Sequence, residues 1–79
     1  MDQETVVAEF AKNQRECVRA IVKKWNGREL FDLRVYYKSP SGEWKPGTKG
    51  LCLQATALPQ LKAAVLALEQ AISAEARSQ

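Results

Sequence analysis

The dipeptide Asn26-Gly27 constrains the fold of this chain more than any other feature, because it stands between two strand-like runs. Both residues tolerate the positive φ angles of a two-residue type I′ turn, whose twist matches that of two antiparallel strands. A two-residue turn also fixes the register, so that Trp25 pairs with Arg28 beside the turn. The sequence therefore predicts a β-hairpin centred on residues 26–27.

Side chains alternate in character along both arms of this hairpin. In the run CVRAIVKKW, residues 17–25, Arg19, Lys23 and Trp25 point to one side, and the other side is mostly apolar. In the run RELFDLRVYYK, residues 28–38, Asp32 and Arg34 alternate with apolar residues. The predicted register lets the cationic sides of the two strands form one surface.

Two further strands complete the predicted sheet. Residues 5–12 form a short edge strand, and residues 49–54 form the last strand. Between the hairpin and the last strand, residues 39–42 predict a turn, residues 43–45 a short extended arm, and Pro46-Gly47 another turn. The result is a four-stranded antiparallel meander with an arm between its last two strands.

A single helix follows over residues 56–76, with Thr56 as its N-cap and Pro59 tolerated in the first turn. Such a helix can cover one face of a small sheet, pack on a partner helix, or do both. We expect an α+β fold in one domain, residues 1–79, with the sheet over 5–54 and frayed ends at 1–4 and about 74–79. The helix carries an apolar stripe that repeats at spacings of three and four residues: Leu58, Leu61, Val65, Leu68 and Ile72.

A chain of 79 residues builds a small core that supplies only ~3–5 kcal/mol, so it needs a further source of stability. Cys17 and Cys52 lie in apolar-patterned segments and are expected to be reduced. Without histidine, two thiols cannot complete a zinc site, so we expect no metal and no cofactor. With neither a disulfide nor a metal expected, self-association is the favoured source of the missing stability.

The N-terminal residues MDQETVV are acidic, unlike a basic secretory or mitochondrial leader, and no run approaches the length of a membrane span. We expect a soluble, intracellular protein.

Positive charge is concentrated in the middle of the chain. Residues 17–53 hold eight bases and three acids, and five of the six aromatic residues fall in the same block. Cations that meet phosphates and rings that stack on bases are what single-stranded nucleic acid binding requires. A basic solvated surface over an aromatic core fits the same composition, and composition alone leaves both open.

Residues 17–72 resemble the positive cofactor 4 family, the single-stranded-DNA-binding transcriptional coactivators with a Whirly-like fold. The resemblance rests on the motifs Asp32-Leu33-Arg34, Gly42-Glu43, Lys49-Gly50-Leu51 and Gln60-Leu61-Lys62, together with the aromatic pair that follows the first of them. Lacking a long serine-rich and lysine-rich tail, the sequence is similar to the short bacterial and bacteriophage members. The resemblance implies a protein of the cytoplasm that is associated with the nucleoid of a bacterium or a bacteriophage-infected cell, or with the nucleus in a eukaryote.

The resemblance implies a homodimer whose helices pack together through the apolar stripe, while the sheets bind single-stranded DNA or a locally melted duplex. By position, Trp25 and Tyr37 would stack on bases, and Trp44 would either stack or pin the arm. Pro46 would be a binding residue of the arm, and five cations would contact the DNA backbone: Lys23, Arg28, Arg34, Lys45 and Lys49.

Several positions depart from the family pattern as it is found in eukaryotic members. Tyr37 stands in place of a tryptophan, and Asn26 and Thr48 stand in place of basic residues. We read Asp32 as one position out of line for pairing with Arg34, which favours a phosphate contact for Arg34.

Three classes of function are open to this chain. The leading hypothesis is a sequence-tolerant single-stranded DNA binder that works with transcription, replication or recombination proteins. The alternative is an interaction module that recruits an acidic protein partner and has incidental nucleic-acid affinity. An enzyme is disfavoured, because histidine, a phosphate-binding glycine loop and a paired set of acids are all missing from the sequence.

Overall fold

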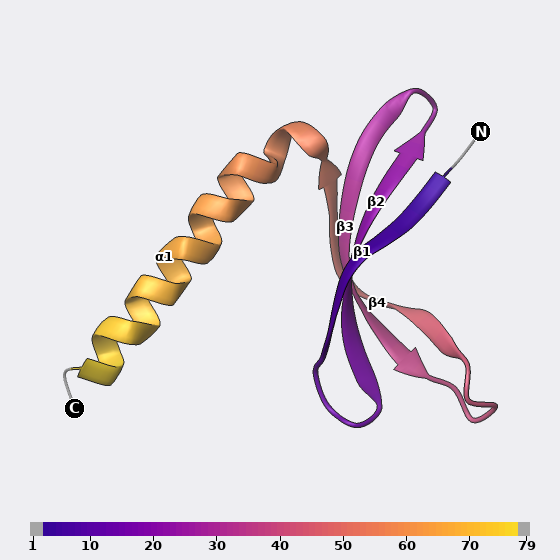
Figure 1. Ribbon diagram of the computed structural model, residues 1–79, viewed down its shortest axis with the longest axis horizontal. Coiled ribbons are helices and arrows are strands. Elements are labelled where there is room, and N and C mark those ends of the chain that lie inside the picture. The colour runs from indigo at the N-terminus through magenta and orange to yellow at the C-terminus, as the bar shows by residue number, and fades with distance from the viewer. Residues whose placement is uncertain (1–2, 78–79) are drawn as a thin grey trace.

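Four antiparallel strands and one C-terminal helix form the chain in the computed structural model, which describes residues 3–77 (Figure 1). The strands lie side by side in the order of the sequence, which confirms the predicted α+β meander. Of the residues predicted to be frayed, 3–4 belong to the first strand and 74–77 to the helix, whereas 1–2 and 78–79 lie outside the described range. The strands are β1 (Gln3–Ala11), β2 (Glu16–Trp25), β3 (Arg28–Lys38) and β4 (Trp44–Gln54).

The β2–β3 hairpin has the predicted turn and register. Asn26 and Gly27 have φ angles of 54° and 75°, and Trp25 pairs with Arg28. The pairing continues without interruption to Glu16 and Tyr37 at the opposite end. This hairpin is the regular centre of the sheet on which both outer strands are built.

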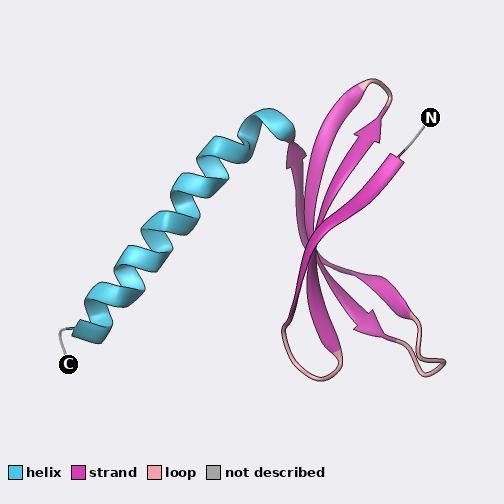
Figure 2. Cartoon of the chain, in the orientation of Figure 1, coloured by secondary structure: helices cyan, strands magenta, loops and turns pink. Residues whose placement is uncertain are grey.

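Strand β4 differs from the predicted arm, turn and strand. Trp44 and Lys45 do not form a separate arm, and Pro46-Gly47 does not form a turn, because β4 runs through residues 44–54, directly after Glu43 (Figure 2). The irregularity is a bulge, since Arg34 pairs with Gly50 and Tyr36 with Pro46, which leaves residues 47–49 opposite Val35 alone. Proline is tolerated in β4 because β4 is an edge strand.

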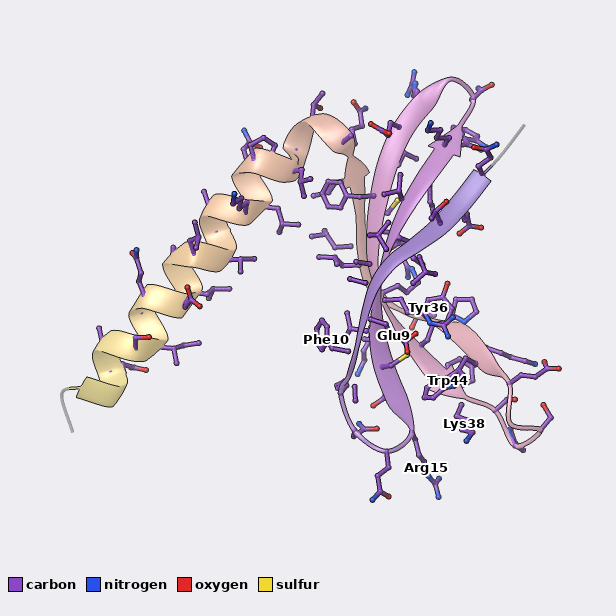
Figure 3. The ribbon with its side chains drawn as sticks, in the orientation of Figure 1. Glu9, Phe10, Arg15, Tyr36, Lys38 and Trp44 are labelled. Carbon is purple, nitrogen blue, oxygen red and sulfur yellow. The ribbon has the colours of Figure 1, made fainter. Side chains whose placement is uncertain are left out.

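The sheet has two chemically different faces. On the polar face lie Arg19, Lys23 and Trp25 of β2 with their partners on β3, and on the apolar face lie side chains such as Val18 and Phe31. Glu9 and Tyr36 point to the polar side, and Phe10 points to the apolar side, where α1 lies (Figure 3). The residues of the polar face include the most buried side chains among those described, which are Cys17, Ile21 and Asp32.

The apolar face is left uncovered by the helix that follows it. A 3₁₀ turn, η1 (Ala55–Ala57), packs against β3, and α1 (Leu58–Arg77) then runs away from the strands (Figure 1). Of the alternatives left open by the sequence, covering a face of its own sheet is not what the helix does in the single chain. Thr56 lies inside η1, which begins after Gln54 without a side-chain cap, so the prediction of Thr56 as N-cap is wrong.

Candidate nucleic-acid interface

Trp25 stands at the hairpin end of the polar face, where 52% of its surface is exposed. The left-handed conformation of Asn26 and Gly27 ends β2 abruptly after the ring. Trp25 borders a hollow of ≈ 240 Å³ together with Lys23, Leu30 and Cys52. A flat ring beside a cation is thus open to a ligand at this end of the sheet.

Tyr37 occupies the other end of β3 and lies on the apolar face. It pairs with Glu16 on one side and Lys45 on the other, and no irregularity in the β2–β3 pairing turns its side chain over. The ring is 43% exposed. It borders a hollow of ≈ 330 Å³ beside the β4 bulge, whose other lining residues are Glu16, Val35, Pro46, Gly47, Thr48 and Lys49.

The two rings that the resemblance pairs are therefore far apart within one protomer. Residues 28 and 37 of β3 are separated by nine steps of about 3.3 Å, or roughly 30 Å, and the two rings occupy opposite faces. Trp44 pairs with Lys38 at the start of β4, on the same side of the sheet as Tyr36 (Figure 3). The sheet presents separate ring-bearing sites instead of one continuous stack.

Asp32 lies at the centre of the polar face and is 1% exposed. Its Oδ2 accepts a hydrogen bond from Arg34 Nε at 2.9 Å and lies 3.1 Å from Lys23 Nζ. Burial by itself raises the pKa of Asp32, but the hydrogen bonds from Arg34 and Lys23 outweigh it and hold that pKa below its usual value. The reading of Asp32 as out of line with Arg34 is wrong, because residues two apart in a strand share a face.

The carboxylate of Asp32 shifts the pKa of both neighbouring cations, Lys23 and Arg34. Hydrogen bonding to Asp32 raises the pKa of Lys23 and that of Arg34 above their usual values. Lys23 also lies 3.7 Å from Glu4 of β1, between Nζ and Oε1. Two of the five cations predicted to contact the DNA backbone are thus already paired with acids of the same chain.

Three other predicted cations are exposed. Across residues 3–77, no ion pair involves Arg28, Lys45 or Lys49. Arg28 lies beside Trp25 at the hairpin, while Lys45 pairs with Tyr37, and Lys49 lines the hollow beside that ring. Each ring-bearing site therefore has at least one cation without an acidic partner.

The sequence model of the family described as Transcriptional Coactivator p15 (PC4) matches residues 12–64. The chain belongs to this family. The matched segment spans β2, β3 and β4, including both ring-bearing sites, and ends in the first turns of α1.

Solved structures of PC4 homologs have the same fold. One from Burkholderia pseudomallei superimposes with a TM-score of 0.79 at 19% identity over 85% of this chain and 98% of that chain. A second crystal form of it gives 0.76 at 20% identity, with 82% and 88% covered. A bacteriophage T5 homolog of the eukaryotic coactivator PC4, implicated in recombination-dependent DNA replication, gives 0.60 at 22% identity, with 94% and 80% covered.

Sequence reasoning missed two residues beside these PC4-family sites. Glu16 lies across from Tyr37, and counting ten pairs back from the Asn-Gly turn finds it. Arg19 donates a 2.7 Å hydrogen bond from Nε to Glu9 Oε2, which raises the pKa of Arg19, and its guanidinium lies 4.5 Å from the centre of the Tyr36 ring. Tyr36 and Arg19 therefore brace the polar face.

The described residues contain neither a cluster of metal-ligating side chains nor a helix long and apolar enough to cross a membrane.

Proposed function

We propose that this PC4-family protein binds single-stranded DNA as a homodimer, without strong sequence preference. One observation carries the proposal: each end of the sheet presents an exposed ring next to an unpaired cation, Trp25 with Arg28 and Tyr37 with Lys45. Rings stack on any base, and cations neutralise phosphates whatever the sequence. Single strands and locally melted duplexes expose both groups.

The proposed partner of the uncovered apolar surface is a second copy of the chain. The apolar face of the sheet and the helix stripe are both open to solvent in the single chain, with Leu68 and Ile72 among its exposed large apolar residues. Contiguous exposed apolar surface of this kind marks an interaction site. Pairing two helices through their stripes would cover the stripes and supply the stability that a short chain lacks.

The cellular process follows from the relatives and forms part of the proposal. The family description names a transcriptional coactivator, and the bacteriophage T5 homolog is implicated in recombination-dependent DNA replication. We propose a role in transcription regulation or in DNA replication and recombination. Membership in a coactivator family supports a binding protein over an enzyme.

The test is a fluorescence-anisotropy titration of a mixed-sequence single strand of about 20 nucleotides, and of its duplex, at several salt concentrations. Of the cations predicted to contact DNA, three have no ion pair among residues 3–77, Arg28, Lys45 and Lys49, and these make six in a dimer. At ~0.7 per phosphate, log affinity should fall against log salt with a slope of about −4.

Trp25→Ala should weaken binding of the single strand by about 5- to 150-fold, because stacking contributes ~1–3 kcal/mol per base. Trp44→Ala serves as the comparison, since it decides whether that ring stacks or only packs. The proposal is refuted if the protein binds single strand and duplex equally weakly and if Trp25→Ala leaves both affinities unchanged. That result would favour an acidic protein partner.

A further inference from the structure

The guanidinium of Arg34 joins three parts of the sheet. Nε donates to Asp32 Oδ2 at 2.9 Å, and Nη1 donates to the backbone carbonyl of Gly47 at 3.1 Å. The guanidinium also lies over Gly50, where a Cβ atom would stand only 2.8 Å from Arg34 Cζ. Arg34 is thus seated between a buried carboxylate on its own strand and the bulge of β4.

The bulge has little else to hold its shape. Residues 47–49 oppose Val35 alone, and β4 is an edge strand with no neighbour on its outer side. Within the described part of the chain, the bond from Arg34 is the one side-chain hydrogen bond to these three residues. The bulge carries Lys49 and forms one wall of the hollow beside Tyr37.

Asp32 is the fixed end of this arrangement. Its side chain is 1% exposed, and its Oδ1 has no hydrogen-bond partner, so Oδ2 alone receives both Arg34 and Lys23. A buried carboxylate without partners is strongly unfavourable, and this gives the Arg34 contact a reason to persist. Arg34 therefore uses both Nε and Nη1 in hydrogen bonds within its own chain.

We propose that Asp32 is a positioning residue for nucleic-acid binding, which acts through Arg34 to fix the β4 bulge and thereby places Lys49 and the hollow beside Tyr37. The proposal rests on the proposed function for its consequence in DNA binding. It assigns Arg34 to the support of the site, in place of the phosphate contact that the sequence suggested.

The proposal predicts a change whose sign is opposite to that expected from charge alone. Asp32→Asn removes one negative charge per protomer and loosens Lys23 and Arg34, yet it should weaken single-strand binding about tenfold, because an amide oxygen holds a charged donor less strongly than a carboxylate does. Glu29→Gln is the matched control: Glu29 is an exposed acid of the same strand without an ion pair among the described residues, and its replacement should leave affinity equal or slightly higher.

If Arg34 instead contacts phosphate and Asp32 merely restrains it, Asp32→Asn should bind more tightly and have a steeper salt slope, by ~0.7 for each phosphate gained. Unchanged or tighter binding overturns the proposal. Arg34→Lys provides a second variant, since it keeps the charge but lacks the fork that reaches both Asp32 and Gly47. It should lose affinity in the same way, and retained affinity in a folded Arg34→Lys also overturns the proposal.

A measurement without DNA separates this inference from the proposed function. The ¹⁵N heteronuclear NOE of the backbone amides in residues 47–49 should fall in both variants, while that of the β1–β2 pairing stays at the wild-type value. If the wild-type protein does not bind single strands, the proposed function fails, and the NOE comparison still decides whether Asp32 and Arg34 hold the bulge. Unchanged NOE values in two folded variants refute that role.

Discussion

Replacing both Leu68 and Ile72 with alanine should weaken self-association by several orders of magnitude. These side chains are 61% and 65% exposed in the single chain. Full burial of such a side chain stabilises by ~1.5–3 kcal/mol, so covering the exposed part contributes ~1–2 kcal/mol. A two-fold dimer contains four of them, for ~4–8 kcal/mol, and alanine keeps roughly a third. The expected loss of ~3–5 kcal/mol raises the dissociation constant about 10²- to 10⁴-fold.

Sedimentation equilibrium over a range of concentrations measures this change directly. Gln70→Ala is the matched control, because Gln70 lies on the opposite side of the same helix and is exposed, so its replacement should leave the dissociation constant unchanged. A wild-type protein that sediments as a monomer throughout, or a double variant that associates like the wild type, would show that the helix stripe does not join two copies.

Two further predictions concern stability. Because the pKa of Asp32 is depressed in the fold, its carboxylate stabilises the protein above the unfolded pKa of about 3.9, and that contribution disappears as pH falls through the lower folded pKa. Urea titrations at several acidic pH values should show the free energy of unfolding falling in the wild type and falling less in Asp32→Asn. An equal dependence of that free energy on pH in the two proteins would contradict the assignment. Gly27→Ala should cost about 1–2 kcal/mol, because Gly27 has a φ of 75° and no atom within 4 Å of a new Cβ, so the cost is purely conformational. An unchanged denaturation midpoint would exclude that strain.

The central hairpin was predictable because its determinants are local. Asn26-Gly27 sets the turn, the turn sets the register, and a period of two then assigns every side chain of β2 and β3 to a face. The same count places Tyr37 with the apolar residues, where the structure has it. The meander follows because short connections keep consecutive antiparallel strands adjacent.

The features that were not predicted depend on contacts between distant residues. Pro46-Gly47 has the composition of a turn. It lies in a bulge within a strand because β4 pairs with β3 both before and after the bulge, and because Arg34 donates a hydrogen bond to the Gly47 carbonyl. The position of α1 is not encoded in its stripe, since an apolar stripe fits its own sheet or a partner equally well. Thr56 is a good capping residue, but the 3₁₀ turn begins one residue earlier and places it inside the turn.

The irregularities in the outer strands also bear on solubility. Strand β1 shifts register between Val6 and Ala8, and β4 contains both its bulge and Pro46, so each free edge of the sheet is interrupted. An uninterrupted edge would offer a row of unpaired backbone groups to the next molecule and invite growth into fibrils. Because both edges are interrupted, edge-to-edge aggregation is discouraged even though the chain exposes many large apolar side chains.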